Sequence, residues 1–183
     1  MPTSATTPDP RPLVGEPLAL DLLNTRWMRD GAVQDLLSSP RGLAVWLGSA
    51  GLGERFEANP ITLLHTKIAR DALHTVVDGS LAQGAADLDL VLDQGRIRAT
   101  LTAEGPGEIP EFDDPRWGPG WLAARNYLEL LAAAPDRIRR CAHEACILHF
   151  YDTSRNGTRR WCSMAACGNR AKASRHYTRV KES

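Results

Sequence analysis

The stretch CAHEACILHFYDTSRNGTRRWCSMAAC, residues 141–167, contains all four cysteines of the chain. They form two pairs of equal internal spacing, Cys141 with Cys146 and Cys162 with Cys167, and fifteen residues separate the pairs. Such pairs suit a tetrahedral Zn²⁺ site, because each pair folds over one side of the metal and the intervening loop lets the two sides meet. The spacing therefore predicts one structural zinc ion bound by four thiolates.

Disulfides, a redox switch and buried free thiols are the other interpretations of these cysteines. Residues 1–12, MPTSATTPDPRP, are rich in Pro, Thr and Ser and contain no apolar run that could act as an export signal, which disfavours disulfides. We expect them to form a disordered tail on a cytoplasmic protein. No stretch approaches the ~18 consecutive apolar residues of a membrane-spanning helix, so no membrane association is expected.

The net charge of zero conceals a strong asymmetry along the chain. Residues 137–183 contain eleven Lys and Arg against three acidic residues, a net charge of +8, so the first 136 residues carry −8. An acidic body joined to a basic module indicates a polyanionic partner, most often nucleic acid. A zinc ion with four thiolates has a formal charge of −2, which could occupy some of the arginines, but an excess of positive charge is left.

The segment from Met164 onward, MAACGNRAKASRHYTRVK, contains no proline and is predicted to form a helix. Its apolar residues recur at helical spacing and are expected to pack on the zinc site: Ala166, Ala173, Tyr177 and Val180. Its polar residues fall on the opposite face: Asn169, Lys172, Arg175, His176 and Arg179. A helix of about fifteen residues is ~22 Å long and can lie along a DNA major groove. Asn169, Lys172, Arg175 and Arg179 are therefore candidate DNA contacts.

The segment between the two cysteine pairs is predicted to form two short strands around the turn sequence SRNG, residues 154–157. Arg159 and Arg160 follow this turn and suit contacts with DNA phosphates. Trp161, which follows them, is expected in the core because large aromatic side chains are usually buried.

Residues around the cysteines are assigned supporting roles. Gly168 would let the backbone approach the metal sulfurs closely. Arg170 falls toward the apolar side of the predicted helix, where it would pair with Asp152 or shield the thiolates. His143 and His149 could in principle replace a cysteine ligand, but four cysteines already complete a tetrahedron, so neither is assigned to the metal.

These strings carry a resemblance to known families. CAHEAC, FYDTSRNGTRR and RRWCSMAACGNRAK together resemble the CGNR zinc-finger family, which is named for the four residues found here at 167–170. The resemblance covers the C-terminal quarter of the chain and includes all four cysteines. Upstream, GEPLALDLLNTRW and SPRGLAVWLGSAGL are similar to the ABATE domain, which accompanies this finger and is associated with stress-induced transcription regulation. The resemblance implies a bacterial, zinc-dependent regulator that binds DNA.

The N-terminal part is predicted to be mainly helical. An apolar segment, 17–25, is expected to form a helix. Two further helices, 40–50 and 60–83, start with a capping residue followed by proline and end before a glycine. Their inward faces are predicted from apolar residues at helical spacing: Leu43, Trp46 and Leu47 in the first, and Ile61, Leu64, Ile68, Ala72, Val76 and Leu81 in the second.

A hairpin is predicted after these helices. Leu88, Leu90 and Leu92 alternate with polar residues, and so do Ile97, Ala99 and Leu101 beyond the Gln94-Gly95 turn, as in two paired strands. The segment from Glu104 to Gly118 is rich in Pro, Gly and acids and is expected to be a loop. Trp121, Ala124, Leu128 and Leu131 define a last helix, which Pro135 ends.

The predicted fold is therefore α+β. Residues 13–135 would form a mainly helical domain with a β-hairpin, and residues 136–183 a small, treble-clef-like zinc finger with four cysteines. A module of this size cannot bury a sufficient core alone, so zinc is expected to supply its stability, typically roughly 10–16 kcal/mol coupled to folding.

The sequence supports two functions, and catalysis is not one of them. Four thiolates leave no open metal position for a reacting water, and the Asp71–His74 pair is typical of a solvated surface contact. One function is a zinc-dependent, DNA-binding, stress-responsive transcription regulator. The alternative is a structural zinc knuckle that binds a protein or RNA, with the N-terminal domain as the ligand-sensing part. A homodimer and a small-molecule ligand of that domain stay open as further partners.

Overall fold

The computed structural model describes residues 8–169. Across this range five α-helices form the body: α1 (Leu18–Leu23), α2 (Pro40–Ser49), α3 (Pro60–His74), α4 (Leu81–Leu92) and α5 (Gly118–Ala133). Three antiparallel strand pairs accompany them: β1 (Arg26–Arg29) with β2 (Ala32–Asp35), β3 (Gly95–Thr102) with β4 (Gly105–Phe112), and β5 (Ile138–Arg140) with β6 (His149–Tyr151). Short helical turns lie at Leu36–Ser38, Thr75–Gly79, Pro115–Trp117, Pro135–Arg137 and Met164–Gly168. The fold is α+β, as predicted.

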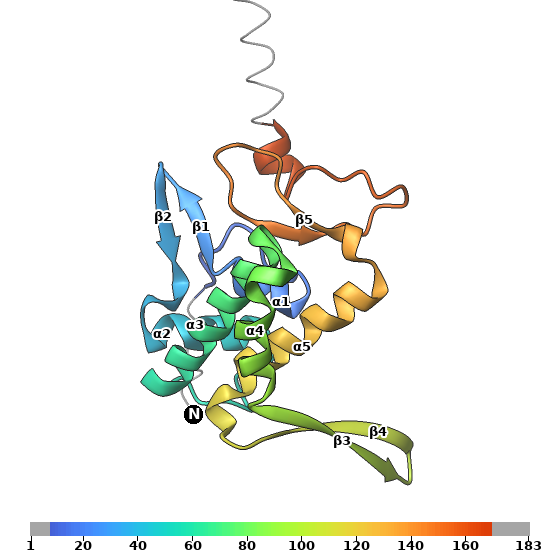
Figure 1. Cartoon of the computed structure of the whole chain (residues 1–183). Coiled ribbons are helices and arrows are strands. Elements are labelled where there is room, and N and C mark those ends of the chain that lie inside the picture. Colours follow the sequence, from blue (N-terminus) through green and yellow to red (C-terminus); the bar gives the residue numbers. More distant parts are fainter. Residues whose placement is uncertain (1–7, 170–183) are drawn as a thin grey trace, which may run out of the picture.

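The helices gather in the centre of the molecule, and the β3–β4 hairpin extends from one end (Figure 1). The C-terminal module, residues 137–169, lies at the opposite end. Helix α1 is central, because it packs against α3, α5 and strand β6 and buries Ala19, Leu20 and Leu22 completely. The cluster of buried apolar side chains continues from the body through Leu148 and Phe150 to the four cysteines, so the body and the module share one core.

The capping signals in the sequence are confirmed. The Ser39 hydroxyl accepts a hydrogen bond from the backbone N–H of Gly42 at 3.3 Å and begins α2. The Asn59 side-chain oxygen accepts from the N–H groups of Ile61 and Thr62, at 3.0 and 2.9 Å, and begins α3. Gly51 follows α2 with a φ of +69°, a left-handed conformation that favours glycine. Helices α1 and α5 also form where the sequence predicts them.

The predicted inward face of α3 is correct only in part. Ile61, Leu64 and Ile68 are 42%, 54% and 42% exposed, whereas Ala72 is buried as predicted. The face that packs on the body mixes polar and apolar residues: Thr62, Thr66, Ala69, Arg70, Ala72 and Leu73. The buried guanidinium of Arg70 donates to the Asp35 carboxylate at 2.7 and 2.8 Å, so a paired charge occupies a position that apolar periodicity assigns to solvent.

The helix predicted for 60–83 is two helices. Helix α3 ends at His74 and is followed by a π-helical turn, Thr75–Gly79. Ser80 then has an extended backbone, and its hydroxyl accepts a hydrogen bond from the N–H of Gln83 at 3.3 Å, which begins α4. The serine cap therefore interrupts a run of apolar residues that otherwise reads as one helix.

The predicted hairpin is displaced along the chain. Residues 88–92 belong to α4, where Leu88 and Val91 are buried and Leu90 is 63% exposed. The apolar residues of this segment fit both patterns: Leu88, Val91 and Leu92 have the spacing of a helix, whereas Leu88, Leu90 and Leu92 alternate as in a strand. Strand β3 pairs instead with β4, within the segment expected to be a loop. Ion pairs hold this ribbon, including Arg98 with Glu111 at 2.6 Å and Arg125 of α5 with Glu108 at 2.7 Å.

The hairpin predicted between the cysteine pairs is also wrong. Strand β6 forms, but its partner is β5, which precedes the first cysteine. The predicted turn does form, and Gly157 has a φ of +61°. The Arg137 guanidinium donates to the backbone carbonyls of Asp152 and Ser154, at 2.9 and 2.6 Å, and thereby ties β5 to the segment that precedes this turn.

The predicted disordered tail begins with residues 1–7, which lie outside the described range. Residues 8–12 differ from the expectation, because they pack on the body. The Arg11 side chain is buried and pairs with Asp9 at 2.7 Å and with Asp21 of α1 at 2.9 Å. Among residues 8–169, no helix combines the length and the apolar character needed to cross a membrane.

Candidate metal centre

The four cysteines occupy two short connections that face each other. Cys141 directly follows β5, and Cys146 stands three residues before β6, so the first pair lies in the connection between these strands. Cys162 precedes the π-helical turn Met164–Gly168, and Cys167 lies within it. Each of the four is at most 7% exposed. The strand pair and the turn therefore bring both pairs into one buried position.

The geometry of the sulfurs fits a tetrahedral zinc ion. All four Sγ atoms lie within 4.8 Å of one another. Cys162 Sγ is 3.8 Å from Cys146 Sγ and 3.6 Å from Cys167 Sγ. A tetrahedron with Zn–S bonds of ~2.3 Å has S···S edges of about 3.8 Å. The backbone N–H of Cys162 also donates to Cys141 Sγ at 3.4 Å, which supports a thiolate at that position.

The electrostatics of the cluster require a cation for all four sulfurs to ionise. A hydrogen bond from Cys162 lowers the pKa of Cys146 to about 5. The same interaction, together with burial, raises the pKa of Cys162, and burial raises the pKa of Cys167 to about 12. One sulfur thus ionises at the expense of its neighbours, since adjacent thiolates repel. A divalent metal removes that conflict, and this module holds one structural zinc ion on Cys141, Cys146, Cys162 and Cys167.

Asp152 organises the loop that leads from β6 to the second cysteine pair. Its side chain is fully buried and accepts hydrogen bonds from the N–H groups of Ser154 and Arg159, both at 2.9 Å. Burial opposes ionisation of this carboxyl, but the hydrogen bonds outweigh it and lower its pKa. The Arg139 guanidinium lies 3.8 Å from this carboxylate. The predicted partner, Arg170, lies outside the described residues.

Arg159 makes internal contacts in place of the predicted exposed position. Its guanidinium donates to the carbonyls of Cys162 and Trp161, at 2.6 and 3.0 Å, and lies 4.2 Å from the centre of the Phe150 ring. It also pairs with Glu16 of the body at 3.3 Å. A guanidinium so engaged supports the metal loop and has little capacity left for a phosphate.

The other predicted site residues are distributed as follows. Arg160 is exposed and lies 5.2 Å above the ring of Trp161, which is half-buried. Asn169 is exposed, and its amide donates to the Ala165 carbonyl at 3.3 Å. Gly168 is buried, and an added Cβ would lie 2.8 Å from the Met164 sulfur, which belongs to the end of a flexible side chain that can move aside. The predicted contacts Lys172, Arg175 and Arg179 lie outside the described residues.

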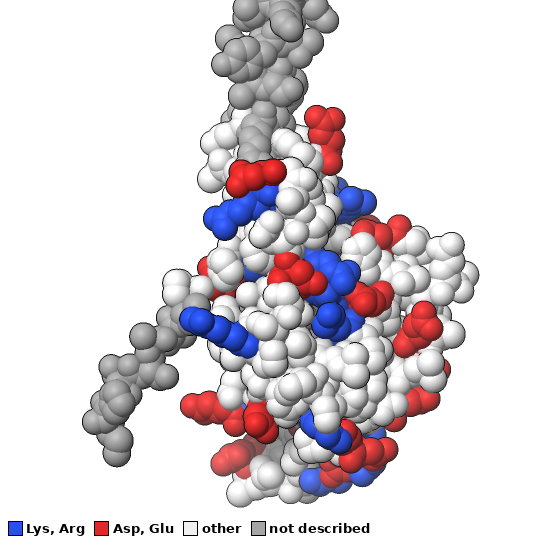
Figure 2. Space-filling view, turned by 90° about the vertical axis from the view of Figure 1, so that its left-hand side faces the viewer, with Lys and Arg blue, Asp and Glu red and all other residues white. Residues whose placement is uncertain are grey.

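A groove of about 580 Å³ runs along the module beside these residues. Hydroxyl, cationic and aromatic side chains line it, among them Ser154, Thr158, Arg160, Trp161 and Ser163. Three exposed arginines of the module, Arg140, Arg155 and Arg160, have no acidic partner among residues 8–169. In contrast, basic and acidic side chains are interspersed over the face of the molecule shown in Figure 2.

Polar side chains of the body hold the module in place, and sequence reasoning missed this role. Asn24, fully buried, donates to the His149 carbonyl and accepts from the His149 N–H, both at 2.9 Å. Glu16 accepts from the Tyr151 N–H at 2.9 Å as well as from Arg159. The signal that could have located Asn24 is a lone amide at the end of the apolar segment LALDLLN.

A second polar contact joins the module to the π-helical turn of the body. His149 Nε2 lies 2.7 Å from Asp78 Oδ1, while His74 Nδ1 lies 3.4 Å from the other oxygen of the same carboxylate. Burial lowers the pKa of His149, and Asp78 opposes that effect. His74 therefore shares a carboxylate with the module, whereas Asp71, its predicted partner, lies 3.1 Å from Arg26.

Comparison with known protein families assigns both parts of the chain. Residues 137–180 match a CGNR zinc finger. Residues 16–134 match the ABATE domain, which is described as "Putative stress-induced transcription regulator". No curated protein matches the chain. Since the ABATE match covers more than half of the sequence, this chain belongs to the ABATE family and carries a CGNR zinc finger at its C-terminal end.

Proposed function

We propose that this protein is a cytoplasmic, bacterial, stress-responsive transcription regulator that binds DNA through its zinc module. The observation that carries the proposal is the joining of a four-sulfur cluster to a basic surface. The sulfurs lie within 4.8 Å of one another, and a groove with exposed Arg160 lies beside them. Residues 137–183 carry a net charge of +8, which suits a polyanion.

Zinc has a structural role in this proposal, and the protein is not an enzyme. Four cysteines complete the tetrahedron and leave no position for a reacting water. The zinc would fix the β5–β6 connection against the Met164–Gly168 turn.

The proposed DNA contacts form two groups. Arg160 and Asn169, exposed on the module, would contact the DNA backbone or a base edge. Lys172, Arg175 and Arg179 follow in sequence at helical spacing and would contact phosphates. We remove Arg159 from this set, because its guanidinium is occupied by carbonyls of the metal loop and by Glu16.

The test is a salt series of DNA binding by the full chain with one zinc per molecule. We expect log affinity to fall with log salt at a slope of about −0.9 per phosphate contact. A triple variant, K172A/R175A/R179A, is expected to reduce the slope by about 3 and to leave zinc content unchanged. The matched control, R29A/R55A/K67A, removes the same charge from the body and should leave the slope unchanged. Absence of binding at low salt would refute the proposal.

A second candidate function keeps the zinc module as a docking element for a protein or an RNA. The groove beside Trp161 favours it as well, because an aromatic ring with hydroxyl and arginine neighbours can receive an unpaired base. Binding to single-stranded RNA, together with no binding to duplex DNA at low salt, would support this alternative.

We also propose that the chain forms a homodimer through the β3–β4 hairpin. Leu101 near its tip is 81% exposed, and an isolated two-stranded ribbon is marginally stable in water. A two-fold dimer would present two modules to paired half-sites. Sedimentation of the wild type and of Leu101→Asp measures the oligomeric state, and a monomer in both would refute the proposed dimer.

A small-molecule ligand of the N-terminal domain is a further proposed partner.

A further inference from the structure

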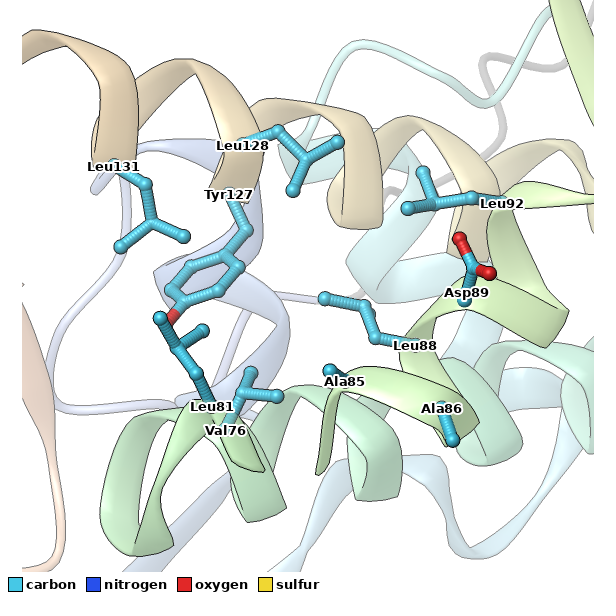
Figure 3. Close-up of a pocket in the computed structure, with 10 residues that line it drawn as sticks. All are labelled: Val76, Leu81, Ala85, Ala86, Leu88, Asp89, Leu92, Tyr127, Leu128 and Leu131. Atoms are coloured by element: carbon cyan, nitrogen blue, oxygen red, sulfur yellow. The ribbon is translucent and has the colours of Figure 1, made fainter. Parts of the chain in front are cut away.

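Helices α4 and α5 enclose an apolar groove on the body, with a volume of about 450 Å³. Figure 3 shows its lining residues, which include Leu81 and Leu88 from α4 and Tyr127 and Leu128 from α5. Val76 of the π-helical turn closes one end. A groove of this volume with mainly apolar walls is within the range of sites that bind small molecules.

Tyr127 provides the polar contact that such a site needs. The residue is only 3% exposed, and its ring lies across the groove with the oxygen beside Leu81 (Figure 3). Burial of the ring raises the pKa of this hydroxyl, so it stays protonated. The hydroxyl makes no hydrogen bond within residues 8–169, and its oxygen is reached by solvent. A tyrosine hydroxyl that solvent reaches in an otherwise apolar wall can exchange its water for the polar group of a ligand, which gives the groove a directional contact.

The chemistry of the lining limits the class of ligand. Asp89 is the one charged residue that lines the groove, and it is exposed at the surface of α4. A carboxylate there disfavours anions and attracts hydrogen-bond donors. We infer that the groove binds a hydrophobic amine or alcohol, whose apolar part contacts the leucines and whose head group bonds to Tyr127 or Asp89.

The groove is connected to the zinc module through one short segment. Val76 and Leu81, which line it, flank Asp78, and Asp78 contacts His149 of β6 at 2.7 Å. The segment includes the π-helical turn Thr75–Gly79, a geometry that is rare and often marks functional sites. A ligand that displaces Val76 or Leu81 would move the Asp78 carboxylate, and with it the contact that holds β6.

We therefore place the sensing site of the proposed regulator in this groove, with the 75–80 segment as its link to the finger. Only the sensing role of the groove rests on the proposed function. Binding in the groove and its effect on β6 are physical properties that can be measured without DNA. The two ideas therefore fail in different experiments.

The first test uses N-phenyl-1-naphthylamine, a neutral aromatic amine that fluoresces in apolar sites, with the full zinc-loaded chain. Ala85 lines the groove, whereas Ala82 is exposed on the same helix but does not line it. We expect Ala85→Phe to weaken binding at least tenfold and the matched control, Ala82→Phe, to leave it unchanged. Tyr127→Phe should fold normally and weaken binding severalfold, because it removes only the hydroxyl.

Two outcomes would overturn the site. Equal binding by Ala85→Phe and Ala82→Phe would place the probe elsewhere. A loss of probe binding as protein concentration rises, in step with self-association, would mean that a second copy of the chain covers the groove.

The second test measures hydrogen exchange of the β6 amides with and without the probe. We expect saturating probe to change the protection of Tyr151 and its neighbours in the wild type. Asp78→Asn should bind the probe with unchanged affinity and show a smaller change in β6. Unchanged exchange in the wild type would refute the link, and it would do so whether or not the protein binds DNA.

Discussion

The helical body and the zinc module are stabilised in different ways. The body buries large apolar side chains, with Trp46, Leu37 and Leu43 all fully inaccessible. The module has Leu148 and Phe150, and most of its other buried apolar residues are the four cysteines. A segment this small cannot bury enough apolar surface alone, so metal bonds add to the core that it shares with the body. The body therefore folds by burial of apolar surface, whereas the module depends on zinc as well.

Zinc removal is the change with the largest expected effect on this comparison. Cys162→Ser should abolish zinc binding, since Cys162 Sγ lies within 3.8 Å of two other sulfurs. The lost stabilisation is of order 10 kcal/mol, so residues 137–169 should lose exchange protection while the helices of the body keep theirs. Metal content and hydrogen exchange measure the two parts separately. Thr158→Ala, an exposed neighbour, serves as the control, and one zinc per chain in the Cys162 variant would contradict the assignment.

A truncated side chain in the core of the helical body tests how far that region depends on apolar burial. Trp46 is fully buried, and its ring N–H donates to Asp21 at 3.0 Å. Trp46→Ala should lower the free energy of unfolding by about 3–5 kcal/mol, through lost burial and the cavity left behind. Denaturant unfolding under saturating zinc measures this change in the free energy of unfolding. The control, Leu90→Ala, removes a side chain that is 63% exposed and should stay within about 0.5 kcal/mol of the wild type.

The contact between the two regions is the third target. Asn24→Ala would leave the buried N–H and C=O groups of His149 without partners, which costs about 1–3 kcal/mol. The loss should appear as faster exchange in β6 with zinc still bound. Asn156→Ala, an exposed asparagine in the turn, provides the comparison. Equal exchange in the two variants would mean that apolar packing alone holds the module.

Local chemistry explains what could be predicted from the sequence. The helix starts at Ser39-Pro40 and Asn59-Pro60 depend on bonds within three residues, and both helices form there. The four metal ligands could be predicted because the two cysteine pairs have the same internal spacing, and their sulfurs lie within 4.8 Å of one another. Such features need no knowledge of the rest of the fold.

Long-range contacts explain what could not be predicted. Arg70 is buried because Asp35, distant in sequence, pairs with it, and Ile61 is exposed on the other face of the same helix. Strand β6 pairs with β5 and not with the segment that follows β6. Asn24 and Glu16 of the body bond to the backbone of β6 and hold the strand in that position. The contact between Asp78 and His149 spans 71 residues. None of these pairs leaves a local periodicity in the sequence.

The smallest expected effect is a pH dependence of the contact between the two regions. Burial lowers the pKa of His149, so the docked state holds it neutral although Asp78 accepts its hydrogen bond. His74 and Arg140 also act on it, and both favour the neutral form. When the module undocks, the pKa returns toward its ordinary value of about 6.5, and the undocked state takes up a proton first. The docking free energy should therefore fall as the pH drops below that value.

Two variants separate this effect from other titrations. His65 also has a pKa lowered by burial, and its ring stacks on Trp117 at 3.9 Å, so it contributes a similar dependence of global stability. Intrinsic amide exchange slows as the pH falls, so the quantity to compare is the protection factor. The protection factor of the β6 amides should fall in the wild type and in His65→Asn as the pH is lowered from 7.5 to below the ordinary histidine pKa of about 6.5. It should change less in His149→Leu, which cannot titrate. Zinc content must be followed in parallel, because thiolates release metal at lower pH. The same pH dependence in His149→Leu would assign the effect to another group and leave Asn24 and Glu16 as the polar contacts that hold the module.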